Sequence, residues 1–296
     1  MKILFMGTPE FAKVSLECLA ENKFDVAGVV TQPDRPAGRK MVLAPPPVKE
    51  YALAKNIPVY QPQNLKNGGF FEQLREIAPD IIVVAAYGNI LPKNILDFPK
   101  YGCVNVHASL LPAYRGASPI NAAVINGEKL TGITTIYMDE GIDTGDMILK
   151  KPLEIGENET FGELHDRLAA LGGEVLAETL NQIQNGTATR EKQPENGVSY
   201  AKKIDNETCE IDWGLPAQKI HDQIRGLSPV PAAFTFLDGK KLKVFKSRVA
   251  GDGVVELLEV QPEGKKRMGA GDFVNGRKNE NRGEREGSVF RFARQF

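Results

Sequence analysis

The sequence predicts an α/β protein, with a doubly wound, Rossmann-like parallel sheet domain followed by a small C-terminal β-barrel (OB-like) domain. In the first half, short apolar runs alternate with amphipathic stretches, as in a parallel sheet covered on both faces. A polar stretch containing Pro and Gly, residues 185–203, then interrupts the pattern. Beyond it, residues 232–251 alternate in strand fashion around Asp238-Gly239, a strong hairpin signal.

The elements of the first half follow one another at short intervals. Thr8 is placed to cap the first helix, with Pro9 at the first helical position. The run "DIIVVAAYG" is the most strand-like segment of the chain. We expect strands at 2–6, 26–31, 57–60, 80–88 and 102–107, and helices at 9–19, 46–55, 70–77 and 117–126.

The second half begins with an expected edge hairpin, residues 133–138 and 147–155, around the Gly-rich loop "DEGIDTGD". One long amphipathic helix follows at 160–184. These patterns place the sheet domain at 1–187, a linker at 188–205 and the β domain at 206–296.

Composition and charge limit the function classes. The chain has 296 residues, 42% hydrophobic, with a net charge of -1, so the average surface does not favour nucleic acid or membrane. The segment from Gly264 onward, however, contains nine basic residues and only four acidic residues. This basic end indicates a polyanionic partner or, alternatively, a solvated tail.

Cysteine usage and the absence of long apolar runs indicate the compartment. Three widely separated cysteines fit neither a disulfide framework nor a zinc site. No run approaches the roughly 20 apolar residues that span a bilayer, and "MKILFMGTPEF" is too short in its apolar part for a signal peptide. We expect a reduced, cytoplasmic protein that works as a monomer without a membrane partner.

Parallel sheets bind ligands at the carboxyl ends of their strands, and three polar residues fall at such loop mouths. Asn105 and His107 share one face of the expected strand at 102–107, because side chains alternate. Asp143 lies in the Gly-rich loop. The first turn, "MGTPEFA", lacks the Gly-x-Gly-x-x-Gly fingerprint of a nicotinamide or flavin enzyme.

Asn105, His107 and Asp143 have the groups that an acyl-type transfer requires. The Asn105 amide and the His107 imidazole can donate to an oxygen that gains charge, and Asp143 can orient the imidazole. The spacing alone leaves two other interpretations open: a structural histidine, and an aspartate that only shapes a turn. No Gly-x-Ser-x-Gly elbow makes Ser109 a nucleophile.

Two segments add a resemblance to these residues. "NVHASLLPAYRGASPI" and "GITTIYMDEGIDTGD" closely resemble the signature of the folate-dependent formyltransferase family. The resemblance implies that Asn105, His107 and Asp143 are catalytic and that 10-formyltetrahydrofolate is the cosubstrate, with no metal. It implies folate contacts by eleven residues: Tyr87, Gly88, Ile90, Leu91, Ser109, Leu110, Leu111, Pro112, Asp139, Glu140 and Gly141.

Further segments resemble the branch of this family that formylates charged initiator tRNA. They are "MGTPEFA", the inserted loop "TQPDRPAGRKMVLAPPPVKEYA", "EIDW" and "QIRGLSPVPAAFTF". The resemblance covers about residues 1–275 and implies initiator methionyl-tRNA as the partner, bound partly by the β domain. We expect tRNA contacts from five basic residues: Arg35, Arg39, Lys40, Lys241 and Lys243.

The inserted loop reads "GRKMVL", where many relatives have a denser basic cluster, so the strength of its RNA contacts stays open. In the β domain, alternation places Lys241 and Lys243 on one strand face, and Lys240 and Lys246 on the other. Trp213 is expected in the core rather than as a stacking platform for a base. The sequence leaves two alternatives open: a sugar-nucleotide formyltransferase, and a folate or nucleotide sensor without turnover.

Overall fold

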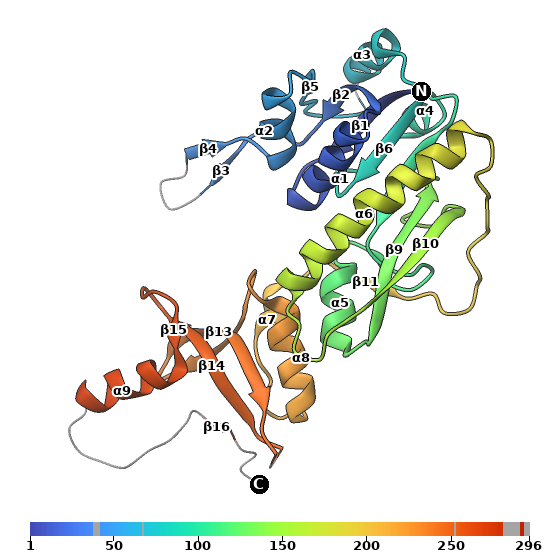
Figure 1. Ribbon diagram of the computed structural model, residues 1–296. Coiled ribbons are helices and arrows are strands. Elements are labelled where there is room, and N and C mark those ends of the chain that lie inside the picture. Colours follow the sequence, from blue (N-terminus) through green and yellow to red (C-terminus); the bar gives the residue numbers. More distant parts are fainter. Residues whose placement is uncertain (38–41, 67, 252, 281–290, 293–296) are drawn as a thin grey trace. The chain divides into compact units, whose positions relative to one another are not determined.

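The computed structural model describes residues 1–37, 42–66, 68–251, 253–280 and 291–292 (Figure 1). These form two compact units. The N-terminal unit holds 1–116, 132–153 and 166–200, and the C-terminal unit holds 117–131, 154–165 and 201–296. The boundaries expected at 187 and 206 stay predictions, and two short segments of the expected sheet domain group with the C-terminal unit.

The N-terminal unit is built on one seven-stranded sheet of order β10-β9-β7-β6-β1-β2-β5. The pairings β5–β2, β2–β1, β1–β6 and β6–β7 are parallel, and β9 runs antiparallel to β7. The predicted, mostly parallel doubly wound sheet is therefore confirmed. Its strands are β1 (Lys2–Gly7), β2 (Asp25–Val30), β5 (Val59–Tyr60), β6 (Ile81–Ala85), β7 (Cys103–His107), β9 (Leu130–Tyr137) and β10 (Met147–Glu154).

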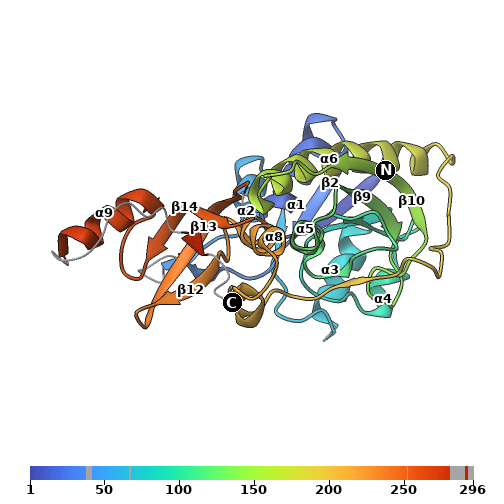
Figure 2. The same cartoon turned by 90° about the horizontal axis from the view of Figure 1, so that it is seen from below.

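Helices cover both faces of this sheet (Figure 2). On one face α6 lies close to α1 and β7, because a Cβ at Gly172 would stand 3.3 Å from Val106 Cγ1 and one at Gly173 2.8 Å from Cys18 Cβ. On the other, Phe70 and Leu74 pack into a buried apolar cluster with the strands. The helices of this unit are α1 (Glu10–Glu21), α2 (Pro47–Ala54), α3 (Gly69–Ile77), α4 (Lys93–Leu96) and α6 (Phe161–Gln184).

The start of α1 corrects one expectation. Pro9 occupies the N-cap position and the helix begins at Glu10, without a capping side chain. The Thr8 hydroxyl instead donates to the Tyr87 carbonyl oxygen, 3.2 Å away, and accepts from the Gln32 amide. Thr8 therefore joins the loops that follow β1, β2 and β6, at the sheet edge where those strands end.

Among the described residues, four short strands lie outside the two larger sheets. Two of them, β3 (Arg35–Ala37) and β4 (Val42–Ala44), pair with each other in the inserted loop. The others are β8 (Arg115–Gly116) and β11 (Tyr200–Ala201). In the part of the chain that the structure describes, no helix is long and apolar enough to cross a membrane.

The C-terminal unit contains the predicted small antiparallel β domain, with strand order β12-β13-β14-β15 and β16 beside β14. Asp238 and Gly239 both have positive φ, 49° and 71°, which is the conformation that a tight hairpin turn requires. The unit contains β12 (Ala233–Leu237), β13 (Lys240–Val249), β14 (Val255–Pro262), β15 (Met268–Gly269), β16 (Arg291–Phe292), α5 (Pro119–Asn126), α7 (Asn206–Cys209), α8 (Ala217–Leu227) and α9 (Ala270–Glu280).

The core of the C-terminal unit confirms the expectation for Trp213. Its ring packs against the buried cluster that includes Ile224 and Val244, and its indole N–H donates to Thr235 Oγ1 at 2.9 Å. The alternation expected along β13 breaks, however. Register shifts on both sides of Lys246 expose that side chain, while Leu242 and Val244 face the core.

Candidate active site

The candidate site is built at the carboxyl end of β7. His107 is the last residue of this strand, and Asn105 precedes it by two, so their side chains lie on the same face. The His107 side chain is only 5% exposed although it adjoins a loop. The parallel neighbours β1 and β6 end at the same sheet edge, as the sequence predicts.

The structure brings the three predicted residues together. Asn105 Nδ2 donates to Asp143 Oδ1 at 3.2 Å, and His107 Nδ1 lies 3.5 Å from Asp143 Oδ2. The Gly116 amide also donates to Asp143 Oδ2, at 2.8 Å. Each carboxylate oxygen therefore faces a donor group, which fixes the plane of the carboxylate.

Both ring nitrogens of His107 lie near oxygen atoms of the protein. Its Nε2 donates to the Tyr114 carbonyl oxygen at 2.9 Å, since a carbonyl can only accept. Its Nδ1 faces the Asp143 carboxylate. These two contacts orient the imidazole at the end of β7, so the ring is positioned to act as a donor beside a reacting oxygen.

The loop that carries Asp143 tolerates few substitutions, because its side-chain hydrogen bonds and close backbone contacts require particular residues. Asp139 Oδ1 accepts from the Gly141 amide at 3.0 Å and from Thr144 Oγ1 at 2.6 Å, which closes a tight turn. A Cβ at Gly145 would overlap the Tyr137 carbonyl oxygen. Asp143 itself has a φ of 53°, in the left-handed region. Its placement is thus determined by its neighbours rather than by its own preference.

The segment after His107 is fixed by hydrogen bonds. Thr134 Oγ1, in β9, donates to the Ser109 carbonyl at 2.7 Å and accepts from the Leu111 amide at 3.1 Å. The Ser109 hydroxyl donates to the Ala113 carbonyl at 2.6 Å. This bond gives Ser109 a structural role, which fits the expectation that it is not a nucleophile. Leu111 is fully buried, and Pro112 follows it through a cis peptide bond.

The other predicted folate residues divide between buried and exposed positions. Tyr87 and Leu91 are buried in the apolar cluster below β6, and burial raises the pKa of the Tyr87 hydroxyl. Ile90 is 69% exposed. Lys93 Nζ lies 3.0 Å from a Glu140 carboxylate oxygen, so an ion pair connects the loop after β6 with the Gly-rich loop.

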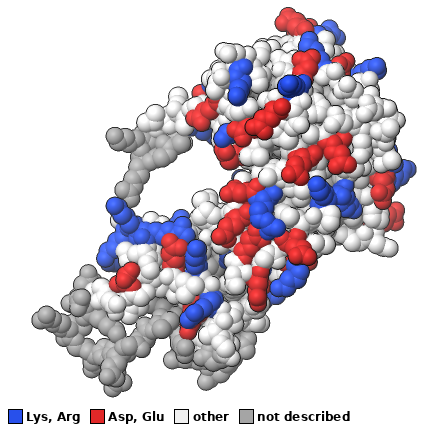
Figure 3. Space-filling model, in the orientation of Figure 1, with Lys and Arg blue, Asp and Glu red and all other residues white. Residues whose placement is uncertain are grey.

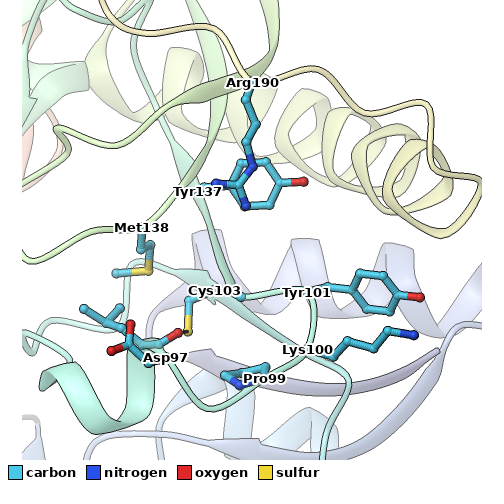
Figure 4. A pocket seen from close by; sticks show the side chains of 10 residues that line it. Asp97, Pro99, Lys100, Tyr101, Cys103, Tyr137, Met138 and Arg190 are labelled. Atoms are coloured by element: carbon cyan, nitrogen blue, oxygen red, sulfur yellow. Dashed lines mark hydrogen bonds between the residues drawn. The ribbon is translucent and has the colours of Figure 1, made fainter.

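A cavity of about 370 Å³ lies at the opposite end of β7 (Figure 4). The Arg190 guanidinium stacks on the Tyr137 ring, with its Cζ 3.7 Å from the ring centroid, at one side of this cavity. Burial raises the pKa of the Cys103 thiol to about 12, so the thiol lines this cavity in its neutral form. The lining residues are Leu96, Asp97, Pro99, Lys100, Tyr101, Gly102, Cys103, Tyr137, Met138 and Arg190, none of them among the predicted folate contacts.

Three residues that the sequence did not single out as site residues contact Asp143 or the segment after His107: Arg115, Gln193 and Ser199. The Gln193 side chain contacts Arg115 and the Asp143 loop, and Ser199 Oγ accepts from the Tyr114 amide at 2.9 Å. Gln193 and Ser199 belong to the segment expected to be a linker. Their polar, aperiodic surroundings carry no local signal of a site.

The predicted tRNA contacts are placed in part. Arg35 lies in β3, whereas Arg39 and Lys40 lie outside the described residues. Lys241 Nζ stands 3.7 Å from the centroid of the Phe234 ring, and Lys243 Nζ donates to the Pro231 carbonyl. Figure 3 shows Lys and Arg side chains gathered on the unit that holds β13–β15.

Metal chemistry was not expected from the sequence. Across the described ranges, no group of three or more His, Cys, Asp or Glu side chains could hold a metal ion.

Comparisons with known proteins identify the family. The formyl transferase family model matches residues 1–180, and the model of the formyl transferase C-terminal domain matches residues 203–251. A methionyl-tRNA formyltransferase from Acetivibrio thermocellus is 48% identical over 302 residues, covering 94% of this chain and 97% of that protein.

Solved structures share the fold. A methionyl-tRNA formyltransferase from Clostridium thermocellum matches with a TM-score of 0.60 and 22% identity, covering 88% of this chain and 98% of that one. An N-formyltransferase from Helicobacter canadensis, in complex with folinic acid and dTDP-3-aminofucose, matches with a TM-score of 0.67 and 21% identity over 91% and 98% of the two chains. The chain belongs to the formyl transferase family, and within it to the methionyl-tRNA formyltransferases.

Proposed function

We propose that this chain transfers the formyl group of 10-formyltetrahydrofolate to the α-amino group of methionyl initiator tRNA, giving formylmethionyl-tRNA for translation initiation. The observation that carries the proposal is the 48% identity, over 94% of the chain, to a methionyl-tRNA formyltransferase. The cluster of Asn105, His107 and Asp143 supports it, because it offers two donors and a carboxylate at one loop mouth.

The proposed reaction begins when the neutral α-amine attacks the formyl carbon. A C–N bond forms, and the carbonyl electron pair moves onto oxygen. The second N–H of the Asn105 amide and the His107 Nε2–H, which turns from the Tyr114 carbonyl to the substrate, donate to this oxyanion. One such donor is typically worth about 2.7–4 kcal/mol. Asp143 holds both donors through its two oxygens, so it sets their directions before the substrate arrives.

The tetrahedral intermediate then collapses. The carbonyl reforms, the bond to the folate nitrogen N10 breaks, and tetrahydrofolate leaves. The proton lost by the attacking amine passes to N10 through Asp143 and water. Asp143 suits this role because it is 14% exposed, so water reaches a carboxylate that also contacts the donors.

The folate cosubstrate is proposed to bind along the loops around this site. Solved relatives of the same fold include an N-formyltransferase complexed with folinic acid, a folate derivative. In this chain, exposed Ile90 and the Gly-rich loop 139–145 offer apolar surface and backbone groups, and Lys93 connects the two loops. Folate recognition of this kind is only weakly sensitive to salt.

The tRNA is proposed to bind the basic residues of the inserted loop and of the β domain. The body of the chain is not basic, so the contacts are local. Arg35, Lys241 and Lys243 are the described members of this set. We place the reaction in the cytoplasm, where charged tRNA is made and used.

The test is a direct assay of transfer. The protein is incubated with 10-formyltetrahydrofolate and methionyl initiator tRNA, and the amino acid released by mild base is analysed. Formylmethionine, absent without protein, is the expected product. Uncharged tRNA and tetrahydrofolate without a formyl group are the controls. Formylation of a dTDP-amino sugar instead of the tRNA would contradict the proposal, and binding of folate without turnover would indicate a sensor.

A further inference from the structure

The Gln193 side chain makes four hydrogen bonds within the N-terminal unit. Its Nε2 donates to the carbonyl oxygens of Asp143 and Gly145, at 2.8 and 2.9 Å. Its Oε1 accepts from Nε and Nη2 of Arg115, at 3.0 and 2.7 Å. One side chain from the expected linker thus connects the Gly-rich loop to the segment that follows His107.

The chemistry of these partners fixes which way the amide points. A guanidinium only donates and a carbonyl only accepts, so the reverse orientation of the Gln193 amide would break all four bonds. Arg115 therefore holds the NH₂ group of Gln193 against the loop. Gly145 is buried, so its carbonyl needs a partner from the protein.

The loop that Gln193 contacts has a strained backbone at Asp143, the residue that carries the catalytic carboxylate. Asp143 is a non-glycine residue in the left-handed region, at a φ of 53°. The two accepting carbonyls bracket the turn between Asp143 and Gly145. A donor that binds both of them therefore opposes relaxation of Asp143 to an ordinary backbone conformation.

The same stretch of chain also supports His107. Ser199 Oγ accepts from the Tyr114 amide at 2.9 Å, and the Ser199 carbonyl accepts from the Arg115 amide at 2.9 Å. Tyr114 is the residue whose carbonyl oxygen accepts the hydrogen bond from His107 Nε2. Gln193 thus contacts the Asp143 loop, and Ser199 contacts the residue that accepts from His107.

We propose that Gln193 is a positioning residue of the formyl transfer, acting by holding the Asp143 loop so that the carboxylate meets Asn105 and His107 together. This inference rests on the proposed function for its reaction. It does not depend on which amine accepts the formyl group, because Gln193 acts on the loop rather than on the acceptor. Arg115 contributes to this positioning because its guanidinium orients the Gln193 amide.

The experiment compares Gln193→Glu and Gln193→Met with the parent protein. Glutamate keeps the length and the acceptor for Arg115, but replaces the NH₂ donor with an oxygen that faces two carbonyls. Methionine keeps the length and removes both functions. Asn196→Ala is the matched control, since Asn196 is an exposed amide residue three positions away. Thermal midpoints are measured for all variants.

Both variants should lose about 10- to 100-fold in kcat, with KM for folate and acceptor nearly unchanged, because small displacements of a catalytic group cost rates of this order. The pH profile of kcat should change shape, since the geometry between Asp143 and His107 changes. A purely structural role would lower the thermal midpoint and leave the pH profile as it is.

A double-mutant cycle with Asp143→Asn tests whether Gln193 affects the rate through Asp143. If Gln193 acts through Asp143, Gln193→Glu should cost little more once that carboxylate is gone. Full additivity would overturn the inference, and so would a near-parental kcat for Gln193→Glu, which would leave Arg115 pairing as the role of Gln193. If the parent formylates a dTDP-amino sugar and not the tRNA, the proposed function is wrong, and the same cycle is run on that acceptor.

Discussion

His107 and His221 are almost equally buried, 5% and 3% exposed, yet their surroundings differ. Both ring nitrogens of His107 face oxygens, one of them a carboxylate. His221, in α8, lies 3.0 Å from the neutral Ser247 hydroxyl, and burial followed by the nearby Arg225 guanidinium lowers the pKa of its imidazole. Burial alone therefore does not identify a catalytic histidine. What differs is the set of partners: His107 lies beside a carboxylate at a strand end, whereas His221 lies beside a neutral hydroxyl and a guanidinium.

The largest expected effect comes from removing the His107 ring. His107→Ala should lower the single-turnover rate by about 100- to 1,000-fold, because it deletes a donor to the oxyanion. His221→Ala is the matched control, which should keep its rate once folded. If both variants turned over at similar rates, the contrast between the two histidines would have no catalytic meaning.

Asp143→Asn sharpens the comparison by keeping the shape beside His107 and removing the charge. We expect the rate to fall by about 100-fold or more and the pH profile of kcat to change, because the amide carries no charge beside His107 and cannot pass on a proton. Rapid-quench measurements between pH 5 and 9 test this. A parental rate with an unchanged profile would reduce Asp143 to a turn residue.

A smaller effect is expected away from the chemistry. Arg39→Ala with Lys40→Ala, or Lys241→Ala with Lys243→Ala, should raise KM for the tRNA several-fold and leave KM for folate unchanged. The slope of the salt dependence should flatten by roughly 1 for each phosphate that the variant no longer neutralises. Lys23→Ala with Lys66→Ala removes the same charge from other exposed positions and serves as the control. Equal KM values and slopes in all three variants would exclude RNA binding by these residues.

The smallest effect concerns the neutral ring. Because the pKa of folded His221 lies below its ordinary value near 6.5, its stabilising contribution is complete above about pH 6.5 and is lost as the pH falls through the folded value. His221→Gln should remove this part of the acid sensitivity and leave the rate nearly parental. Thermal midpoints at pH 5 and 7.5 test it, since a destabilisation of 1 kcal/mol lowers the midpoint by roughly 2–4 °C. An equal decrease in parent and variant would contradict it.

Much of the fold could be predicted because its signals are local. The apolar run at 80–88 and the Asp238-Gly239 turn encode a strand and a hairpin within a few residues. The N-terminus of α1 could not be predicted, because the Thr8 hydroxyl binds the carbonyl of Tyr87, 79 residues away in the sequence. The bulge at Lys246 likewise depends on pairing with β14.

The site divides in the same way. Strand alternation predicts that Asn105 and His107 lie on the same face of one strand. The position of Asp143 in a Gly-rich loop predicts that its side chain lies near them. Gln193 could not be found, because nothing around it in the sequence distinguishes it from a polar linker. Its role depends on a return of the chain to the sheet edge, which no periodicity encodes.

That return of the chain has a consequence for the order of synthesis. A fragment that ends at residue 187 contains every side chain of the catalytic trio, yet it lacks the Gln193 and Ser199 bonds to the surrounding loops. On the ribosome, the catalytic residues therefore leave the exit tunnel before their supports do. Until residue 199 has emerged, we therefore expect the catalytic trio to work about 10- to 100-fold below its full rate, although its three side chains have already been made.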